Sequence, residues 1–371
     1  MRGLSLKHAF RNALASLAAT FILVMSAMYI LTRDSVEIEH RPLLRTKPLT
    51  NIGQPRPSSL TLVIYQQYHS TACYHNLYNN SLYRGLNQAA GQRRPNSDDL
   101  DAPTMFPLAT DPYYQNLLCE FSGMLAVAAH AARLHPQEWI GFQSWRAVDK
   151  RRAISQAAED SILSAIGKRS HGDAIYFWSD GGEDDVRVLD FYEHCDRSHK
   201  HCKIAFQRAF GVLFGHRTGE TDAPDAPPMP NDGGAWVFMS YFVMRTESFL
   251  EYMRFVRDFF IAVDDMWFHT HRDANVCILA QGVSSSPEYE SLHCYCYLLE
   301  RLISIWAYHS GRRMLFVNPI TGSISEQHEL KERTAWLHYF SKSQFRKHLE
   351  KLERRAVAMN DRGLIQKLQT F

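Results

Sequence analysis

Residues 60–70 read LTLVIYQQYHS, and the first six of them form a short run rich in apolar and β-branched side chains. A run of this length is typical of a buried strand. Two similar runs follow, EWIGF at 138–142 and AIYFW at 174–178, and the sequence predicts a further strand at 236–244. We expect these strands to form the core sheet of a domain.

Helical patterns lie between these strands, because apolar residues recur there at three- and four-residue spacing. They cover residues 114–134, 150–168, 249–263 and 298–306. Two stretches rich in proline and small polar residues, 91–112 and 218–234, read as loops. Strands thus alternate with helices from residue 60 onward, which predicts an α/β fold with a mainly parallel sheet and flanking helices.

The N-terminal region carries a second strong pattern. Residues 13–32, ALASLAATFILVMSAMYILT, contain no charged residue, Gly or Pro. As a helix they would span about 30 Å, the thickness of the hydrocarbon layer of a membrane. Basic residues precede this run and acidic residues appear only after it, which places the N-terminus in the cytoplasm. A cleaved signal peptide is the alternative, since it has the same order of charges.

This pattern predicts five consecutive parts. They are a cytoplasmic tail at 1–12, a transmembrane signal-anchor at 13–32, a proline-containing stem at 33–58, the α/β domain at 59–325, and a basic amphipathic helical segment at 326–371. The whole would be a type II single-pass membrane protein. The sequon Asn79–Ser81 lies after the anchor, where glycosylation enzymes could reach it, and so agrees with this topology.

Charge and cysteine content restrict the partners. The net charge of +2 gives no electrostatic case for binding nucleic acid. All seven cysteines follow residue 32, so some of them would pair in an oxidising compartment. Residues 194–202, HCDRSHKHC, resemble a metal site in composition, but zinc sites usually present paired ligands from two separated places. A Cys195–Cys202 disulfide, or simply free thiols, is the preferred interpretation.

Six segments, taken in order, resemble the glycosyltransferases of bacterial capsular-polysaccharide synthesis. They are LVIYQQYHS (62–70), YRGLNQAAG (83–91), NLLCEFSGMLAVAAHAARLHPQEWIGFQSWR (116–146), DAIYFW (173–178), YFVMRTESFLEYMRFVRDFF (241–260) and LLERLISIWAYHSGRRMLFVNPI (298–320). The resemblance covers nearly all of the predicted outer domain. It implies a GT-A-like α/β fold, a nucleotide sugar as donor, and a glycan or other hydroxyl compound as acceptor. With a type II anchor, it also implies the Golgi or another secretory compartment.

The sequence departs from the family at one strand end. Where the family has His-Tyr-Arg-Arg, this chain has Gln143, Ser144, Trp145 and Arg146, so one arginine is retained. This departure keeps a second hypothesis open, a non-catalytic glycan-binding or scaffold protein on the same fold. A third hypothesis, a membrane-tethered hydrolase, would require two opposed carboxylates, which the sequence does not plainly contain.

The resemblance also selects candidate site residues. The catalytic candidates are Glu120 and Glu300, either of which could instead form a structural ion pair. The donor-binding candidates are Arg146, Tyr68, His69, Arg84, Gly85, Gly141 and Arg301. At the end of a parallel strand, Arg146 is expected to point into a desolvated crevice and grip the donor diphosphate with its guanidinium fork. The alternative for Arg146 is an ion pair with Asp149 or Glu138.

A metal site is a further candidate. Many nucleotide-sugar transferases use Mn²⁺ or Mg²⁺, which prefer oxygen ligands and bridge phosphates. The carboxylates of Asp180, Asp184 and Asp185 follow the predicted strand at 174–178 and could supply such ligands. A solvated acidic turn is the alternative interpretation of this Gly-Gly segment.

Overall fold

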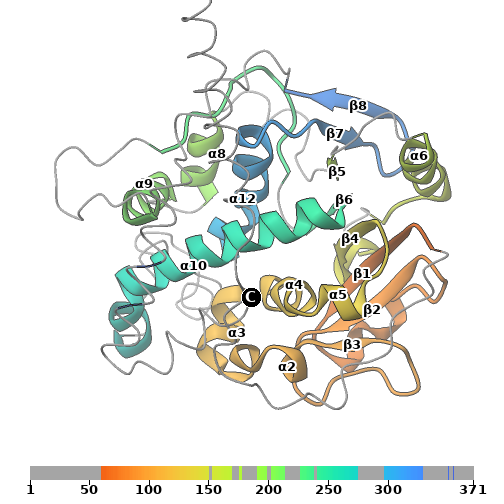
Figure 1. Cartoon of the computed structure of the whole chain (residues 1–371), viewed down its shortest axis with the longest axis horizontal. Helices are drawn as coiled ribbons and strands as arrows, with labels where there is room; N and C mark the ends of the chain where they lie inside the picture. The colour runs from red at the N-terminus through yellow and green to blue at the C-terminus, as the bar shows by residue number, and fades with distance from the viewer. Residues whose placement is uncertain are drawn as a thin grey trace, which may run out of the picture. The chain divides into compact units, whose positions relative to one another are not determined.

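We describe the protein from a computed structural model (Figure 1). The described residues are 60–149, 153–168, 175–177, 190–198, 202–213, 226–237, 240–274, 296–328, 350 and 354. They belong to one compact unit, Leu49–Phe371. Among them, no helix has both the length and the apolar character needed to cross a membrane. The expected tail, anchor and stem, and most of the expected C-terminal segment, lie outside these residues and stay predictions.

In the described part of the chain, the centre is an eight-stranded sheet with the order β3-β2-β1-β4-β6-β5-β7-β8. Its strands are β1 Leu62–Tyr68, β2 Tyr83–Asn87, β3 Leu100–Asp101, β4 Trp139–Ser144, β5 Ile175–Phe177, β6 Phe242–Arg245, β7 Met314–Val317 and β8 Ile324–Gln327. Strands β1 to β4 are mutually parallel, and β5 is parallel to β7, whereas β6 and β8 run antiparallel to their neighbours. This confirms a mixed α/β fold whose central sheet is mostly parallel.

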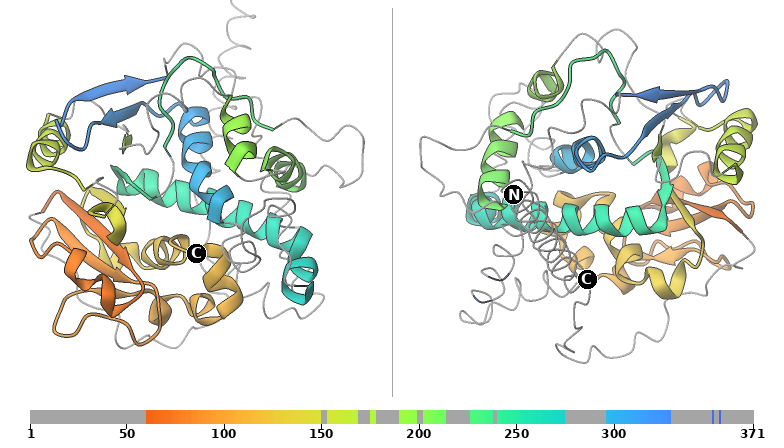
Figure 2. Two further views of the ribbon diagram at one scale, coloured as in Figure 1. Left: turned by 180° about the vertical axis from the view of Figure 1, so that it is seen from behind. Right: turned by 45° about the horizontal axis from the view of Figure 1, so that its top comes forward.

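Helices cover both faces of the sheet. The α-helices are α2 Ala102–Met105, α3 Pro112–Leu118, α4 Phe121–Ala129, α5 Ala131–Leu134, α6 Gln156–Gly167, α8 Phe191–Ser198, α9 Cys202–Leu213, α10 Thr246–Ala274 and α12 Cys296–His309, and the 3₁₀ helices are η1 Thr71–Asn76, η2 Pro107–Thr110 and η3 Trp145–Ala147. Helices α4, α10 and α12 share the larger apolar core with one face, and α6 packs on the other. Figure 2 shows α10 as the long helix that runs past α12.

Strand β1 is central because both of its faces are apolar. Val63 and Tyr65 enter the larger core, while Leu62 and Ile64 enter the core beneath α6. A strand buried on both faces reads as a nearly continuous apolar run, which is the pattern that predicted it. The sequence then changes to Gln66 and Gln67, at the carboxyl end of the strand.

The structure corrects three of the expected elements. The helix expected at 114–134 is three helices, because the chain breaks at Cys119, which has φ of +46°, and again at His130. The loop expected at 91–112 contains β3 and α2, whose apolar side chains are buried. In the segment expected to form a strand at 236–244, the described strand, β6, begins only at Phe242.

Candidate functional site

The topology indicates where a ligand should bind. From β1 the chain moves outward to β2 and β3, and then returns past β1 to β4. In open α/β sheets, ligands bind outside the carboxyl ends of the strands at such a reversal of strand order. A cavity of about 370 Å³ lies there. Its lining includes Gln67, Tyr68 and His69 from the end of β1, Gln88 after β2, Trp145 after β4, and Cys119, Glu120 and Ser122 from the α3–α4 junction.

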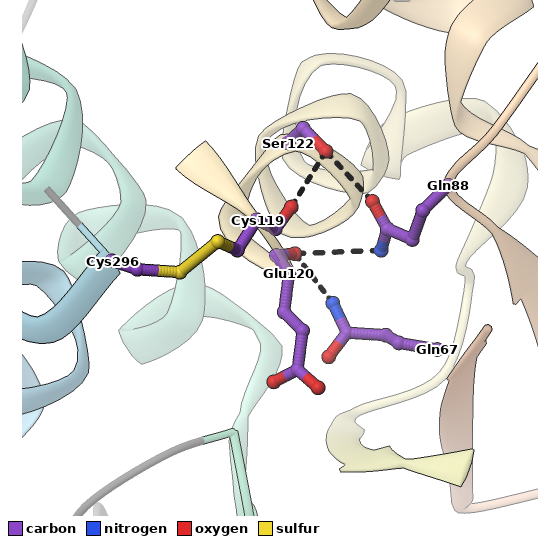
Figure 3. Close-up of a disulfide and its surroundings, with 6 residues drawn as sticks. All are labelled: Gln67, Gln88, Cys119, Glu120, Ser122 and Cys296. Carbon is purple, nitrogen blue, oxygen red and sulfur yellow. Dashed lines mark hydrogen bonds between the residues drawn. A yellow bond between two sulfur atoms is a disulfide. The ribbon is translucent and has the colours of Figure 1, made fainter. Parts of the chain in front are cut away.

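A network of side-chain amides holds Glu120 against this cavity (Figure 3). The Glu120 carbonyl accepts hydrogen bonds from Gln67 Nε2 at 2.6 Å and from Gln88 Nε2 at 3.5 Å. Ser122 Oγ donates to Gln88 Oε1 at 2.7 Å and to the Cys119 carbonyl at 2.9 Å. The backbone of Glu120 is thus fixed, while its half-buried carboxylate has no hydrogen bond or ion pair among the described residues.

The break between α3 and α4 is also held covalently. Cys119 adopts a left-handed backbone conformation, with φ of +46°, which is uncommon for a residue other than glycine. Its sulfur forms a disulfide with Cys296, the first residue of α12. Strained backbone that persists beside a cavity is typical of functional sites, where surrounding structure imposes it.

A second disulfide joins Cys195 of α8 to Cys202 of α9. This confirms the disulfide interpretation of the segment at 194–202 over free thiols. In the described part of the chain, no three His, Cys, Asp or Glu residues lie close enough to hold a metal ion. Cys73 is a buried free thiol.

His69 and Trp145 add two aromatic rings to the lining, and Arg146 lies beside Trp145. The rings of His69 and Trp145 meet edge to face, with centroids 5.8 Å apart. The Arg146 guanidinium lies 5.3 Å from the Trp145 ring centroid, a cation–π distance. Burial lowers the pKa of His69 and the positive charge of Arg146 lowers it further, while the Glu120 carboxylate opposes them. The imidazole is therefore neutral at pH 7, between a cation and a carboxylate.

The structure decides between the two interpretations of Arg146 only in part. Glu138 pairs with Arg245 at 3.5 Å, and Asp149 accepts a hydrogen bond from Asn76 at 3.1 Å. Neither acidic partner expected for a structural ion pair therefore contacts Arg146. However, its side chain is exposed at the rim of the cavity rather than desolvated in the crevice, because η3 begins directly after β4 and turns it toward solvent.

Tyr68 forms a rigid part of the cavity wall. Its hydroxyl donates to Asp99 Oδ2 at 2.8 Å and accepts from the Arg94 backbone N–H at 2.8 Å. Arg94 grips the same carboxylate with two nitrogens, at 3.1 and 2.9 Å. Burial raises the pKa of Tyr68 well above its ordinary value. Tyr68 therefore contributes its ring to the cavity, because its hydroxyl is already committed.

The structure does not bring three of the candidates on the sheet to the cavity. Arg84 is buried and donates to the Asp98 carbonyl at 2.7 Å. Gly85 packs so closely on Asp99 that a Cβ would overlap the carboxyl group. Gly141 lies inside the sheet, where a Cβ would stand 2.9 Å from Val243 Cγ2. These residues fix the sheet and the loop beside β3.

The two candidates on α12 do not line the cavity either. Arg301 is buried, donates to the Tyr297 carbonyl at 2.9 Å, and has its pKa lowered to about 10 by burial. Glu300 lies one turn beyond Cys296. Burial raises the pKa of Tyr252, and the negative charge of Glu300 raises it further. Asp180, Asp184 and Asp185 lie outside the described residues.

Several residues that line the cavity were not among the sequence candidates, and Gln67, Ser122 and Trp145 are examples. Gln67 donates a hydrogen bond to the Glu120 carbonyl, and Ser122 supports the same carbonyl through Gln88. The Trp145 ring lies at a cation–π distance from the Arg146 guanidinium. A signal was available for Gln67, since paired glutamines end an otherwise apolar strand. Trp145 was noted only as a departure from the family pattern. Nothing in the sequence pointed to Ser122, because it depends on contacts with a distant strand end.

No protein-family model and no curated protein matches the sequence. Among solved structures, one described as the apo structure of the bifunctional glycosyltransferase WbbM is similar, with 11% sequence identity and a TM-score of 0.31. The similarity covers 67% of this chain and 42% of that protein, so it spans less than half of the WbbM chain. A likeness as distant as this is no argument for the function of this chain.

Proposed function

We propose that this domain is a glycosyltransferase that moves a sugar from a nucleotide-sugar donor to a hydroxyl group of a glycan or related acceptor. The observation that carries the proposal is the cavity at the carboxyl ends of β1, β2 and β4. Tyr68, His69 and Glu120 line it and Arg146 lies at its rim, although they come from separate segments of the sequence. These are segments that resemble a glycosyltransferase family, and the mostly parallel sheet fits its GT-A-like architecture.

The chemistry of the cavity suits the reaction. The Glu120 carboxylate would take the proton of an acceptor hydroxyl while that oxygen bonds to the anomeric carbon of the donor. The bond between the anomeric carbon and the phosphate oxygen breaks, and the nucleoside diphosphate leaves with the electron pair. The Arg146 guanidinium would offset the negative charge that develops on this leaving group. Trp145 would offer an aromatic face to a ring of the substrate.

A Mn²⁺ or Mg²⁺ ion is part of the sequence-based expectation. Its expected ligands, Asp180, Asp184 and Asp185, lie outside the described residues, and the described residues supply no cluster that could replace them.

The direct test is release of free nucleoside diphosphate by the purified full-length chain, across a panel of nucleotide sugars with Mn²⁺ present or absent. Glu120→Gln should lower turnover by about 10²- to 10⁴-fold and leave donor affinity nearly unchanged. Glu193→Gln, an exposed change on α8, serves as the matched control. Failure to bind or turn over any donor would contradict the proposal. Glycan binding without donor binding would favour the non-catalytic alternative.

A further inference from the structure

The Gln67 side chain has one polar atom that the fold leaves unsatisfied. Gln67 is 1% exposed, and its Nε2 donates to the Glu120 carbonyl at 2.6 Å. A backbone carbonyl can only accept a hydrogen bond, so the NH₂ end of the amide must face it and Oε1 must point elsewhere. That oxygen is buried and has no hydrogen-bond partner among the described residues. The orientation of the amide is thus fixed, and one acceptor is left over.

A leftover acceptor at a cavity indicates what kind of group belongs there. A buried carbonyl oxygen without a donor costs free energy, so native structures normally satisfy it. Figure 3 shows Gln67 Oε1 directed away from the Glu120 carbonyl, on the side to which the Glu120 side chain extends. The Glu120 carboxylate, when ionised, is also an acceptor only. Gln67 and Glu120 both line the cavity, and the two groups left without a partner on them, Gln67 Oε1 and the Glu120 carboxylate, are both acceptors.

We propose that Gln67 Oε1 and the Glu120 carboxylate receive two neighbouring hydroxyl groups of a saccharide ring whose apolar face lies on Trp145. Each hydroxyl of a vicinal diol brings one donor, and the ring brings C–H groups that suit an aromatic surface. The ribose of a nucleotide and the hexose of a donor or acceptor both offer this diol. The inference deepens the proposed function by naming what the cavity recognises, and it would also hold for a glycan-binding domain without transfer activity.

A divalent cation is the competing occupant, since it too is attracted to oxygen atoms. Mg²⁺ requires near-octahedral coordination and is usually held through carboxylates. Among the described residues that line the cavity, Glu120 alone carries a carboxylate. His69 is a second possible ligand, but no three His, Cys, Asp or Glu side chains lie together in the described part of the chain. A diol, which needs only the two acceptors, fits these residues better.

The test asks whether the contribution of one ligand hydroxyl to binding depends on one protein atom, Gln67 Oε1. Isothermal calorimetry on the purified full-length chain would compare uridine and guanosine 5′-diphosphates with their 2′- and 3′-deoxy forms. It would also compare methyl glucoside, galactoside and mannoside with their deoxy forms. In the native chain, a hydroxylated probe should bind about fivefold more tightly than the deoxy form that lacks the contacted hydroxyl. In Gln67→Met this ratio should fall to near one, because the acceptor is gone.

The ratio separates recognition from a merely structural role. If Gln67 serves only to hold the Glu120 carbonyl, Gln67→Met would weaken all probes alike and leave the ratio unchanged, which would overturn the proposal. Binding of no probe, or binding of Mn²⁺ alone that disappears in Gln67→Met, would overturn it as well. A changed ratio for nucleotides assigns the diol to ribose, and a changed ratio for glycosides assigns it to a hexose.

Two further comparisons keep the result interpretable. Gln143→Met is the matched control, because Gln143 is equally buried but shares the register of Gln66, on the sheet face opposite Gln67. Should Gln67→Met fail to fold, Gln67→Asn replaces it, since it keeps the amide but withdraws the oxygen. Diol recognition without release of nucleoside diphosphate would sustain this inference and contradict the proposed transferase. Release of nucleoside diphosphate with an unchanged binding ratio in Gln67→Met would support the proposed transferase and overturn this inference.

Discussion

Arg146 shows how one residue can keep its chemistry while its surroundings differ from those expected. Its guanidinium lies over the Trp145 ring at the solvent-exposed rim, and its charge reaches His69. Stacking of this kind holds a planar cation in one orientation. A diphosphate that approaches the cavity would therefore meet a positioned fork, although one that water partly screens.

We expect Arg146→Lys to weaken donor binding about fivefold and to leave the melting temperature unchanged. An ammonium keeps the charge but loses the bidentate fork and the stacking on Trp145. Since the side chain is exposed, solvent screening limits the loss to about 1 kcal/mol. Donor titration and thermal melting of both chains check this, with Arg133→Lys, an exposed change on α5, as control. A lower melting temperature with unchanged donor affinity would assign Arg146 a structural role.

Asp258 predicts a pH dependence of stability. It lies on α10 at 1% exposure, and burial raises the pKa of its carboxyl from 3.8 to about 6, although Arg257 opposes this at 2.7 Å. Between about pH 4 and 6 the folded chain binds this proton and the unfolded chain does not. The contribution of Asp258 to stability therefore increases as the pH falls through that range, by up to about 3 kcal/mol.

Urea unfolding at several pH values tests this expectation. Asp258→Asn should flatten the pH dependence between 4 and 6 and raise the free energy of unfolding at pH 7, because no charge is then buried. Asp160→Asn, at an exposed position on α6, should leave the profile as in the native chain. A native profile with no rise in stability toward pH 4, or one that Asp258→Asn leaves intact, would contradict the assignment.

Of the sequence candidates that lie at the cavity or beside it, all except Glu120 lie near a strand end. Tyr68, His69 and Arg146 lie within four residues of the ends of the strands predicted at 60–65 and 138–142, so the carboxyl-end rule places them together. Arg84, Gly85 and Gly141 looked similar in sequence. Their positions inside the sheet, or against Asp99, depend on which strands pair and on what packs above them. Pairing of this kind is a long-range property that local sequence does not contain.

Among the elements, the α3–α4 junction supplies Cys119, Glu120 and Ser122 to the cavity. A continuous helix through 114–134 would have carried Glu120 on an ordinary helical face. Instead, the left-handed Cys119 and its disulfide to Cys296 interrupt the helix beside the cavity. The apolar spacing on both sides of the break is helical, so periodicity alone could not reveal it. The pairing with a cysteine 177 residues away was equally beyond the sequence.

We expect this disulfide to contribute more to stability than the one between α8 and α9. The chain-entropy model scales with the logarithm of the loop closed. The Cys119–Cys296 bond spans 177 residues and the Cys195–Cys202 bond spans 7. The model then gives about 5 kcal/mol for the first and about 2 kcal/mol for the second. Urea unfolding of the two double Cys→Ser variants measures this difference.

The same two variants also test the link to function. Cys119→Ser with Cys296→Ser should reduce turnover, since the backbone that presents Glu120 loses its covalent support. Cys195→Ser with Cys202→Ser, away from the cavity, should keep turnover near that of the native chain. Equal stability and equal turnover in the two variants would show that the junction does not depend on its disulfide.

For the whole molecule, topology across a membrane remains a prediction from residues 13–32, and an exposed sequon gives a way to test it. Asn79 lies at the surface between η1 and β2. The following Asn80 Oδ1 accepts from the Leu82 and Tyr83 backbone N–H groups at 2.9 and 3.3 Å, which forms a turn. The acceptor asparagine thus sits on an accessible turn of the folded domain, where a glycan would not disturb the core.

If the domain lies on the luminal side, the full-length chain produced in cells with a eukaryotic secretory pathway should carry a glycan on Asn79. Treatment with an endoglycosidase should increase its electrophoretic mobility. Asn79→Gln and Ser81→Ala should each abolish that change, whereas Asn80→Gln keeps the sequon and should preserve it.

An uncleaved anchor further requires that an N-terminal tag stays with the chain and that alkaline extraction leaves the chain in the membrane. A glycosylated chain that loses the tag and is released would instead establish the cleaved signal peptide. An unmodified chain would contradict both, because the anchor and the signal peptide alike deliver residues beyond 32 to the glycosylating side.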